Sequence, residues 1–143
     1  MPDSSRYVIR LQDVETLAFD WGQLTFTCSP SVNGATRLSA GIVTMGPGEG
    51  HGRHNHPGAE EIIHVISGSG EQMIENESGE PTTWQVGPDT TIFVPASRFH
   101  ATRNTGDRPM TVFVVYAPHG PETLMRSLPG CQILPPAMSA DER

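Results

Sequence analysis

The sequence predicts an all-β fold, a sandwich or barrel built from short strands. Glycine and proline supply 15 and 13 of the 143 residues, so turns are frequent, and apolar residues make up only 36% of the chain. Short apolar or alternating runs recur between these turns, which is typical of sandwiches and barrels. This length supports one hydrophobic core, so we expect a single domain over residues 1–143. The core is expected at about residues 20–118, between a flexible N-terminus at 1–5 and a flexible tail at 136–143.

The expected strands follow one another with turn signals between them. Arg37–Met45 ends at a Gly-Pro-Gly sequence, and Glu61–Ile66 is an apolar run closed by Gly68-Ser69-Gly70. Glu71–Glu75 then returns antiparallel, as expected after a glycine-rich turn. Met110–Ala117 is apolar on both faces, which indicates a strand packed on two sides. The remaining predicted strands are Tyr7–Leu11, Gln23–Cys28, Thr82–Val86, Thr91–Val94 and Phe99–Asn104.

Other segments carry turn or helix signals. Ser29–Gly34 and Glu77–Pro81 are rich in turn residues and are predicted to be loops. Pro121–Leu128 is a candidate for one short helix, because proline occupies its first turn and Pro129-Gly130 follows as a stop.

The chain is acidic, with a formal net charge of −7 at pH 7 and no lysine. It has no basic run, so it is a poor partner for nucleic acid or an anionic membrane. It also lacks an apolar run of about 18 residues and the apolar core of a signal peptide. Cys28 and Cys131 follow no zinc or redox spacing, so we expect reduced, structural cysteines in a cytoplasmic protein.

Three histidines and a glutamate have the spacing of a metal site. His54 and His56 are two residues apart, and on a strand their side chains would point to the same face, about 6–7 Å apart. Glu61 follows closely, and His100 lies further along the chain. Three nitrogens and one carboxylate oxygen suit zinc, iron, nickel, copper or manganese better than calcium. We therefore predict one divalent transition metal, whose identity the sequence leaves open.

The residues around these ligands resemble the two motifs of the cupin family. The first motif is matched at every spacing by Gly48, His54-x-His56, Glu61 and Gly68. The second is matched by Pro95, His100 and Asn104. Two positions depart from it: Ser97 stands in place of the inner glycine, and Asp89 in place of the leading glycine. Both positions shape turns, so the departures concern loop geometry and not ligation.

This resemblance implies a double-stranded β-helix, the cupin jelly-roll barrel, with the metal inside one end. It also implies a homodimer. Members of the family include dioxygenases, isomerases, decarboxylases, polyketide cyclases and ligand-binding modules. We expect a metalloenzyme that acts on a small organic substrate, with a dioxygenase-like oxidoreductase favoured. The alternatives are a non-redox isomerase, cyclase or lyase, and a non-catalytic module that binds a small ligand or a sugar.

Neighbouring residues are assigned by strand parity. Glu61 is preferred over Glu60 as the carboxylate ligand, because adjacent strand residues face opposite ways and the gap to Gly68 fits Glu61. Glu61 is also the candidate catalytic base. His64 has the opposite parity and should face away from the metal, and His51 and His119 are expected in loops.

Two arginines are candidates for substrate binding. Arg98 shares the parity of His100, and Arg53 directly precedes His54. A guanidinium at the barrel rim binds a carboxylate or phosphate in a bidentate manner. Met45, Phe93 and Val112 are candidates for an apolar lining of the barrel interior.

Overall fold

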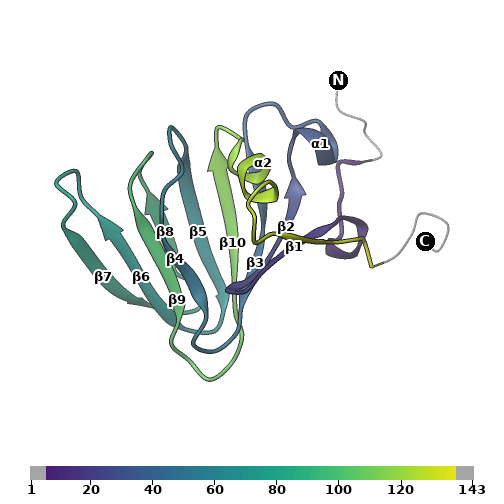
Figure 1. Cartoon of the computed structure of the whole chain (residues 1–143). Coiled ribbons are helices and arrows are strands. Elements are labelled where there is room, and N and C mark those ends of the chain that lie inside the picture. The colour runs from purple at the N-terminus through teal and green to yellow at the C-terminus, as the bar shows by residue number, and fades with distance from the viewer. Residues whose placement is uncertain (1–5, 138–143) are drawn as a thin grey trace.

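Two antiparallel β-sheets form the protein, in a computed structural model that describes residues 6–137 (Figure 1). The larger sheet has seven strands in the order β11-β1-β2-β3-β10-β5-β8, and the smaller has four in the order β4-β9-β6-β7. The sheets face each other as a jelly roll, and the short helix α2 lies beside the larger sheet near one end of β10 (Figure 1). The predicted all-β fold is confirmed.

The bounds of the elements are as follows. The strands are β1 (Thr16–Phe19), β2 (Gly22–Cys28), β3 (Ser39–Met45), β4 (Gly50–His54), β5 (Glu60–Ser67), β6 (Gly70–Glu75), β7 (Pro81–Val86), β8 (Thr91–Val94), β9 (His100–Asn104), β10 (Met110–Ala117) and β11 (Gln132–Leu134). The helices are the 3₁₀-helix η2 (Leu11–Asp13), α1 (Pro30–Asn33) and α2 (Pro121–Arg126).

The core lies between the two sheets and is organised around β10. This strand pairs with β3 on one side and β5 on the other. Its alternate residues Met110, Val112, Val114 and Tyr116 are each at most 2% exposed and point into the core. The residues between them are half-buried on the opposite face, which explains why the strand is apolar on both faces.

All the predicted strands between Gln23 and Ala117 are present, with ends that differ by two residues or fewer. The predicted strand Tyr7–Leu11 is wrong, because this segment has no partner strand; it is bent and irregular up to Leu11, where η2 begins. Strands β1, β4 and β11 and the short helix α1 were not predicted, and α2 ends two residues before Leu128. The predicted flexible segments at 1–5 and 136–143 lie outside the described residues, apart from Pro136 and Ala137.

Gly68 shows how a motif residue shapes the barrel. Its φ of +81° is in the left-handed region. A Cβ there would lie 2.7 Å from the Cα of Met110, so only glycine allows the β5–β6 turn to pass this close to β10.

Cys28 and Cys131 are both free. Within residues 6–137, no helix is both long and apolar enough to cross a membrane.

Candidate metal centre

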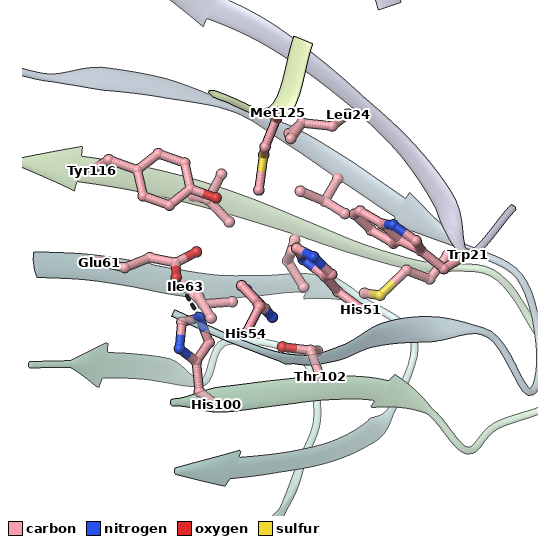
Figure 2. Close-up of a pocket in the computed structure, with 14 residues that line it drawn as sticks. Trp21, Leu24, His51, His54, Glu61, Ile63, His100, Thr102, Tyr116 and Met125 are labelled. Carbon is pink, nitrogen blue, oxygen red and sulfur yellow. Dashed lines mark ion pairs between the residues drawn. The ribbon is translucent and has the colours of Figure 1, made fainter. Parts of the chain in front are cut away.

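His54, His56, Glu61 and His100 come together at one end of the barrel. One potential ligand atom from each side chain lies within 4.8 Å of all the others. His54 ends β4 and is paired directly with His100 at the start of β9, so sheet register brings the two sequence motifs together. Glu61 reaches the same point from β5 in the opposite sheet (Figure 2).

His56 is placed by a loop and not by the strand alternation that predicted it. Strand β4 ends at His54, so His56 lies two residues beyond the strand. The backbone N–H of Ser97 donates to the His56 carbonyl (3.3 Å), and the Ser97 hydroxyl accepts from Gly58 N–H (2.9 Å). Ser97 has a φ of +65°, the left-handed conformation that a glycine would adopt easily. The departure from the motif therefore keeps the turn geometry and adds a hydroxyl that holds the His56 loop.

The second departure has the same outcome. Asp89 also has a φ of +65°, and its backbone N–H donates to the carbonyl of Val65 over 2.9 Å. Aspartate tolerates this conformation better than most residues. Both residues that stand in place of glycine therefore adopt the left-handed conformation that glycine favours.

Three of the four inward-facing ligand atoms are buried and have no hydrogen-bond partner among the described residues. They are His56 Nε2, Glu61 Oε1 and His100 Nε2. His100 Nε2 is 2.9 Å from Glu61 Oε1 (Figure 2), and His56 Nε2 is 3.5 Å from the same oxygen. These close approaches lack hydrogen-bond alignment. Unpartnered buried polar atoms cost free energy, and a cation at their centre would satisfy all of them. The donor set therefore fits a metal ion.

Backbone carbonyls orient two of the imidazoles. His54 Nδ1 is 2.6 Å from the carbonyl of Gly52, and His100 Nδ1 is 2.9 Å from the carbonyl of Arg98. Each Nδ1 must carry the proton in order to donate to a carbonyl, which leaves the Nε2 lone pair free. This is the outer-shell arrangement that usually supports a metal-binding histidine.

The environment keeps His51, His54 and His56 neutral. Burial, followed by the charges of His56 and His100, lowers the pKa of His51 to about 3. Burial is also the main cause that lowers the pKa of His54 and of His56; for His56, the charge of Glu61 acts in the opposite direction. Neutral imidazole is the form that binds a metal. The site is thus prepared for a cation at neutral pH.

The structure also separates the two adjacent glutamates. Glu61 is only 3% exposed and belongs to the cluster, whereas Glu60 is exposed on the other face of β5. His64 is on this outer face as well, where its Nδ1 lies 2.8 Å from the Thr91 hydroxyl. His119 is exposed in the loop before α2, as the sequence predicts.

The cluster opens into a small, mostly apolar cavity between the sheets (Figure 2). Its volume is about 20 Å³. Besides His54, Glu61 and His100, it is lined by Trp21, Leu24, Val43, Met45, His51, Ile63, Thr102, Val112, Val114, Tyr116 and Met125. The predicted lining residues Met45 and Val112 are confirmed. Phe93 is not, because the outward position on β8 leaves it 53% exposed.

His51 is a cavity residue and not the loop residue that we expected. It lies in β4, and its ring stacks between Trp21 (centroids 4.1 Å apart) and His54 (3.4 Å). Strand alternation would put His51 and His54 on opposite faces, but the register shifts between them, which indicates a bulge. No sequence signal marks this bulge, so His51 and Trp21 were missed.

Tyr116 was also missed, although it shares the parity of Val112 and Val114 on β10 and that pattern would have identified it. The side chain is 2% exposed. Burial, then the charge of Glu61 and a hydrogen bond to it, raise the pKa of Tyr116 well above its usual value. The hydroxyl therefore stays protonated and is placed to donate to Glu61.

Neither arginine is directed into the cavity. Arg53 pairs with Glu75 and lies 3.8 Å from the ring centroid of Phe99, and Arg98 pairs with Glu77 (3.1 Å). Arg98 precedes the first residue of β9, so the parity argument that linked it to His100 does not apply. The prediction of a substrate anchor at either residue stays without structural support.

Comparison with known proteins agrees with this architecture. A family model described as the cupin domain matches residues 41–116, more than half of the chain. The polyketide synthase CurC of Streptomyces cyaneus is 28% identical over 115 residues, which cover 80% of this chain and 71% of CurC. Glucose-6-phosphate isomerase of Thermococcus kodakarensis is 33% identical over 63 residues, which cover 44% of this chain and 33% of the isomerase.

A solved structure of Bacillus subtilis oxalate decarboxylase, a protein with Mn(II) centres, superposes with a TM-score of 0.72 at 21% identity. The match covers 78% of this chain but only 29% of the decarboxylase, and at this identity it shows the fold alone. From the family match, together with the jelly-roll fold and the two motifs, this chain belongs to the cupin family.

Proposed function

We propose that this cupin binds one divalent transition metal through His54, His56, Glu61 and His100, and that the metal centre acts on a small organic substrate. The observation that carries the proposal is the set of buried ligand atoms without hydrogen-bond partners, which face one another at the edge of an apolar cavity. A purely structural cluster of histidines would be expected to pair these atoms with protein groups.

A bound metal would supply a Lewis acid for an oxygen of the substrate. The protein contributes the remaining functions. The apolar lining excludes water, which strengthens every electrostatic interaction in the cavity. Glu61 is the only carboxylate among the described lining residues, and the protonated hydroxyl of Tyr116 is placed to donate to it. This pair is suited to holding a proton at Glu61 or passing it on, so it supports the predicted role of Glu61 as a base.

The lining also limits the class of substrate. None of the described lining residues is an arginine, and the chain has no lysine, so the cavity lacks a cationic side chain for a phosphate or a second carboxylate. This favours an apolar ligand that chelates through neutral or phenolic oxygens. Similarity to CurC, named as a polyketide synthase, points in the same direction. Similarity to the isomerase covers less of the chain and gives weaker support.

Two reaction classes fit such a ligand. Proton transfer next to a carbonyl, as in an isomerisation or cyclisation, is favoured by the adjacent Glu61 and Tyr116. The dioxygenase-like reaction expected from the sequence stays a prediction, and dioxygen consumption distinguishes the two. The homodimer and the cytoplasmic location also stay predictions.

The test begins with elemental analysis of protein purified without added metal. Binding is then measured by calorimetry with acetylacetone, 4-nitrocatechol, oxalate and glucose 6-phosphate, with His56→Ala as the metal-deficient control and with dioxygen uptake followed in parallel. We expect close to one metal per chain and binding of the first two compounds only. Absence of metal from the wild-type protein, or binding that His56→Ala does not weaken, would contradict the proposal.

A further inference from the structure

The metal cavity as it stands is too small for an organic substrate. Its volume of about 20 Å³ is room for about one water molecule, which needs roughly 10–15 Å³. Met125, carried by α2, points into the cavity from the side opposite His54 and His100 (Figure 2). The side chain is only 5% exposed, so it fills space that a ligand of the metal would need.

The other side of the cavity offers no comparable route. There the rings of Trp21, His51 and His54 stack at centroid separations of 4.1 and 3.4 Å, and Phe19 extends the stack at 5.2 Å. Rings in contact leave no space for a further group between them. Methionine, in contrast, is unbranched with three rotatable bonds and adapts its shape easily. The wall that can yield is therefore the one formed by Met125.

Helix α2 has only limited attachment to the barrel. It is six residues long. Its inward residues Pro121, Glu122 and Met125 are buried, but Leu124 on the same helix is 62% exposed. Arg126 pairs with Glu15 on the surface (2.7 Å), where the two side chains are 54% and 39% exposed. An ion pair this exposed contributes little to holding the helix down.

A much larger cleft lies against another face of the same helix. Its volume is about 560 Å³, and Glu122, Thr123 and Arg126 of α2 line it together with residues that include Leu17 and Phe26. The ring of Phe26, which lines this cleft, lies 6.1 Å from the ring of Tyr116, which lines the metal cavity, so the two spaces are close together. Helix α2 therefore stands between a cleft that can hold an organic molecule and a cavity that cannot.

We propose that Met125 is the gate and the size filter of the metal centre. A substrate passes from the outer cleft when α2 and Met125 move, and the Met125 side chain limits the size of a ligand that reaches the metal. Motions of short lids of this kind control access in many enzymes. The inference rests on the proposed function, since it assumes that the metal binds a substrate.

The central test compares a bulky and a small metal ligand on protein loaded with Co(II). Association of 4-nitrocatechol and of azide is followed by stopped-flow absorbance for the wild type, Met125→Ala and Leu124→Ala. Because binding that waits for a conformational change is slow, Met125→Ala should speed 4-nitrocatechol association by at least about tenfold. Azide association and Co(II) content should stay unchanged. The exposed matched control, Leu124→Ala, should change neither.

A second measurement needs no metal. Phenol binding to the metal-free proteins is followed by NMR, because enlarged apolar cavities take up small aromatic molecules. We expect binding to Met125→Ala and none to the wild type. Should Met125→Ala fail to fold, Met125→Val is used, with the same directions expected and smaller changes.

Equal association rates of 4-nitrocatechol in the wild type and the Met125 variant would refute the proposed gate. The same holds if Met125→Ala speeds azide association as much as 4-nitrocatechol association. The metal-free experiment separates this failure from failure of the proposed function. A protein that binds no Co(II) refutes the metal centre, yet phenol binding still shows whether Met125 limits the cavity. If the protein binds Co(II) and azide but Met125→Ala does not change 4-nitrocatechol association, the metal centre is supported and the gate is refuted.

Discussion

Charged and titratable side chains that are neighbours in the sequence differ in their interactions on the two sides of the smaller sheet. On the outer side, Arg53 contacts both oxygens of Glu75 (2.5 and 3.1 Å) and stacks on Phe99, and Arg98 binds Glu77. On the inner side, their close neighbours His54 and His100 turn toward the cavity. There, the cluster includes buried nitrogen and oxygen atoms that have no partner within the described part of the chain.

This difference in pairing indicates that the outer contacts are structural and that the inner cluster is functional. An outer ion pair has water beside it, so pairing is easy and adds little. An inner polar atom without a partner is destabilising, and it persists only where another requirement maintains it. The outer pairs are complete by themselves, whereas a bound cation would complete the inner cluster. Variants on the inner side should therefore act mainly on metal binding, and variants on the outer side should not.

The largest effect is expected from removing an inner ligand. His56→Ala should lower metal affinity by at least about 100-fold, because four ligands together contribute roughly 10–16 kcal/mol in protein zinc sites and one of them is lost. Metal content is measured after dialysis against a weak chelator. His119→Ala removes an exposed histidine and serves as the matched control, with affinity unchanged. Full occupancy in His56→Ala would remove His56 from the centre.

A pair of adjacent variants gives a smaller and sharper contrast. Glu61→Gln removes the inward carboxylate charge and should weaken metal binding by about 10- to 100-fold, similar to the loss of a supporting group in a metal site. Glu60→Gln makes the same chemical change on the exposed face and should leave affinity unaltered. The reverse outcome would mean that the register of β5 around the metal is wrong by one residue.

How much of the fold and of the site could be predicted depends on the kind of sequence signal. The cluster of four side chains and the strands around it were predictable, because motif spacing and alternation are local and β5, β9 and β10 follow them. Strand β4 was missed because its residues Gly50–His54 contain glycine, histidine and arginine and no apolar side chain; only pairing with β9 defines it as a strand. His51 and Trp21 were missed for a related reason, since a bulge and a turn between strands bring them to the cavity.

The two arginines, whose predicted role as substrate anchors stays a prediction, show where local patterns stop being informative. The alternation of strand side chains was extended to Arg98, which lies in the loop two residues before β9 begins, where alternation no longer holds. Arg53 does lie in a strand, but Glu75 on β6 neutralises it, and no local pattern shows a partner 22 residues away. Long-range ion pairs and bulges arise from tertiary structure, so they are the features that sequence patterns predict least well.

The metal-free protein should lose stability in mild acid. His51, with a pKa of about 3, and His54 and His56, with lowered pKa values, bind protons less readily folded than unfolded. Stability is therefore greatest above about pH 6.5 and falls as the pH is lowered; for one such histidine the loss between pH 6.5 and pH 5 is about 1–2 kcal/mol. Urea denaturation with EDTA measures it. His51→Phe keeps a ring in the stack and should make the decline shallower; an unchanged decline would show that His51 does not take part.

The smallest effects are expected on the outer side. Arg98→Ala breaks a pair whose partner Glu77 has an 87% exposed side chain, so metal affinity and melting temperature should barely change. Arg53→Ala should also leave metal affinity unaltered but affect stability more, because Glu75 is only 8% exposed and loses its partner. The hydrogen bond from Arg53 lowers the pKa of Glu75, so this contribution is present above the usual glutamate pKa and is lost as the pH falls through the folded value. Calorimetry with 4-nitrocatechol decides the remaining point: if Arg98→Ala weakened its binding while metal content held, Arg98 would be a substrate anchor after all, and the outer side would share in the function.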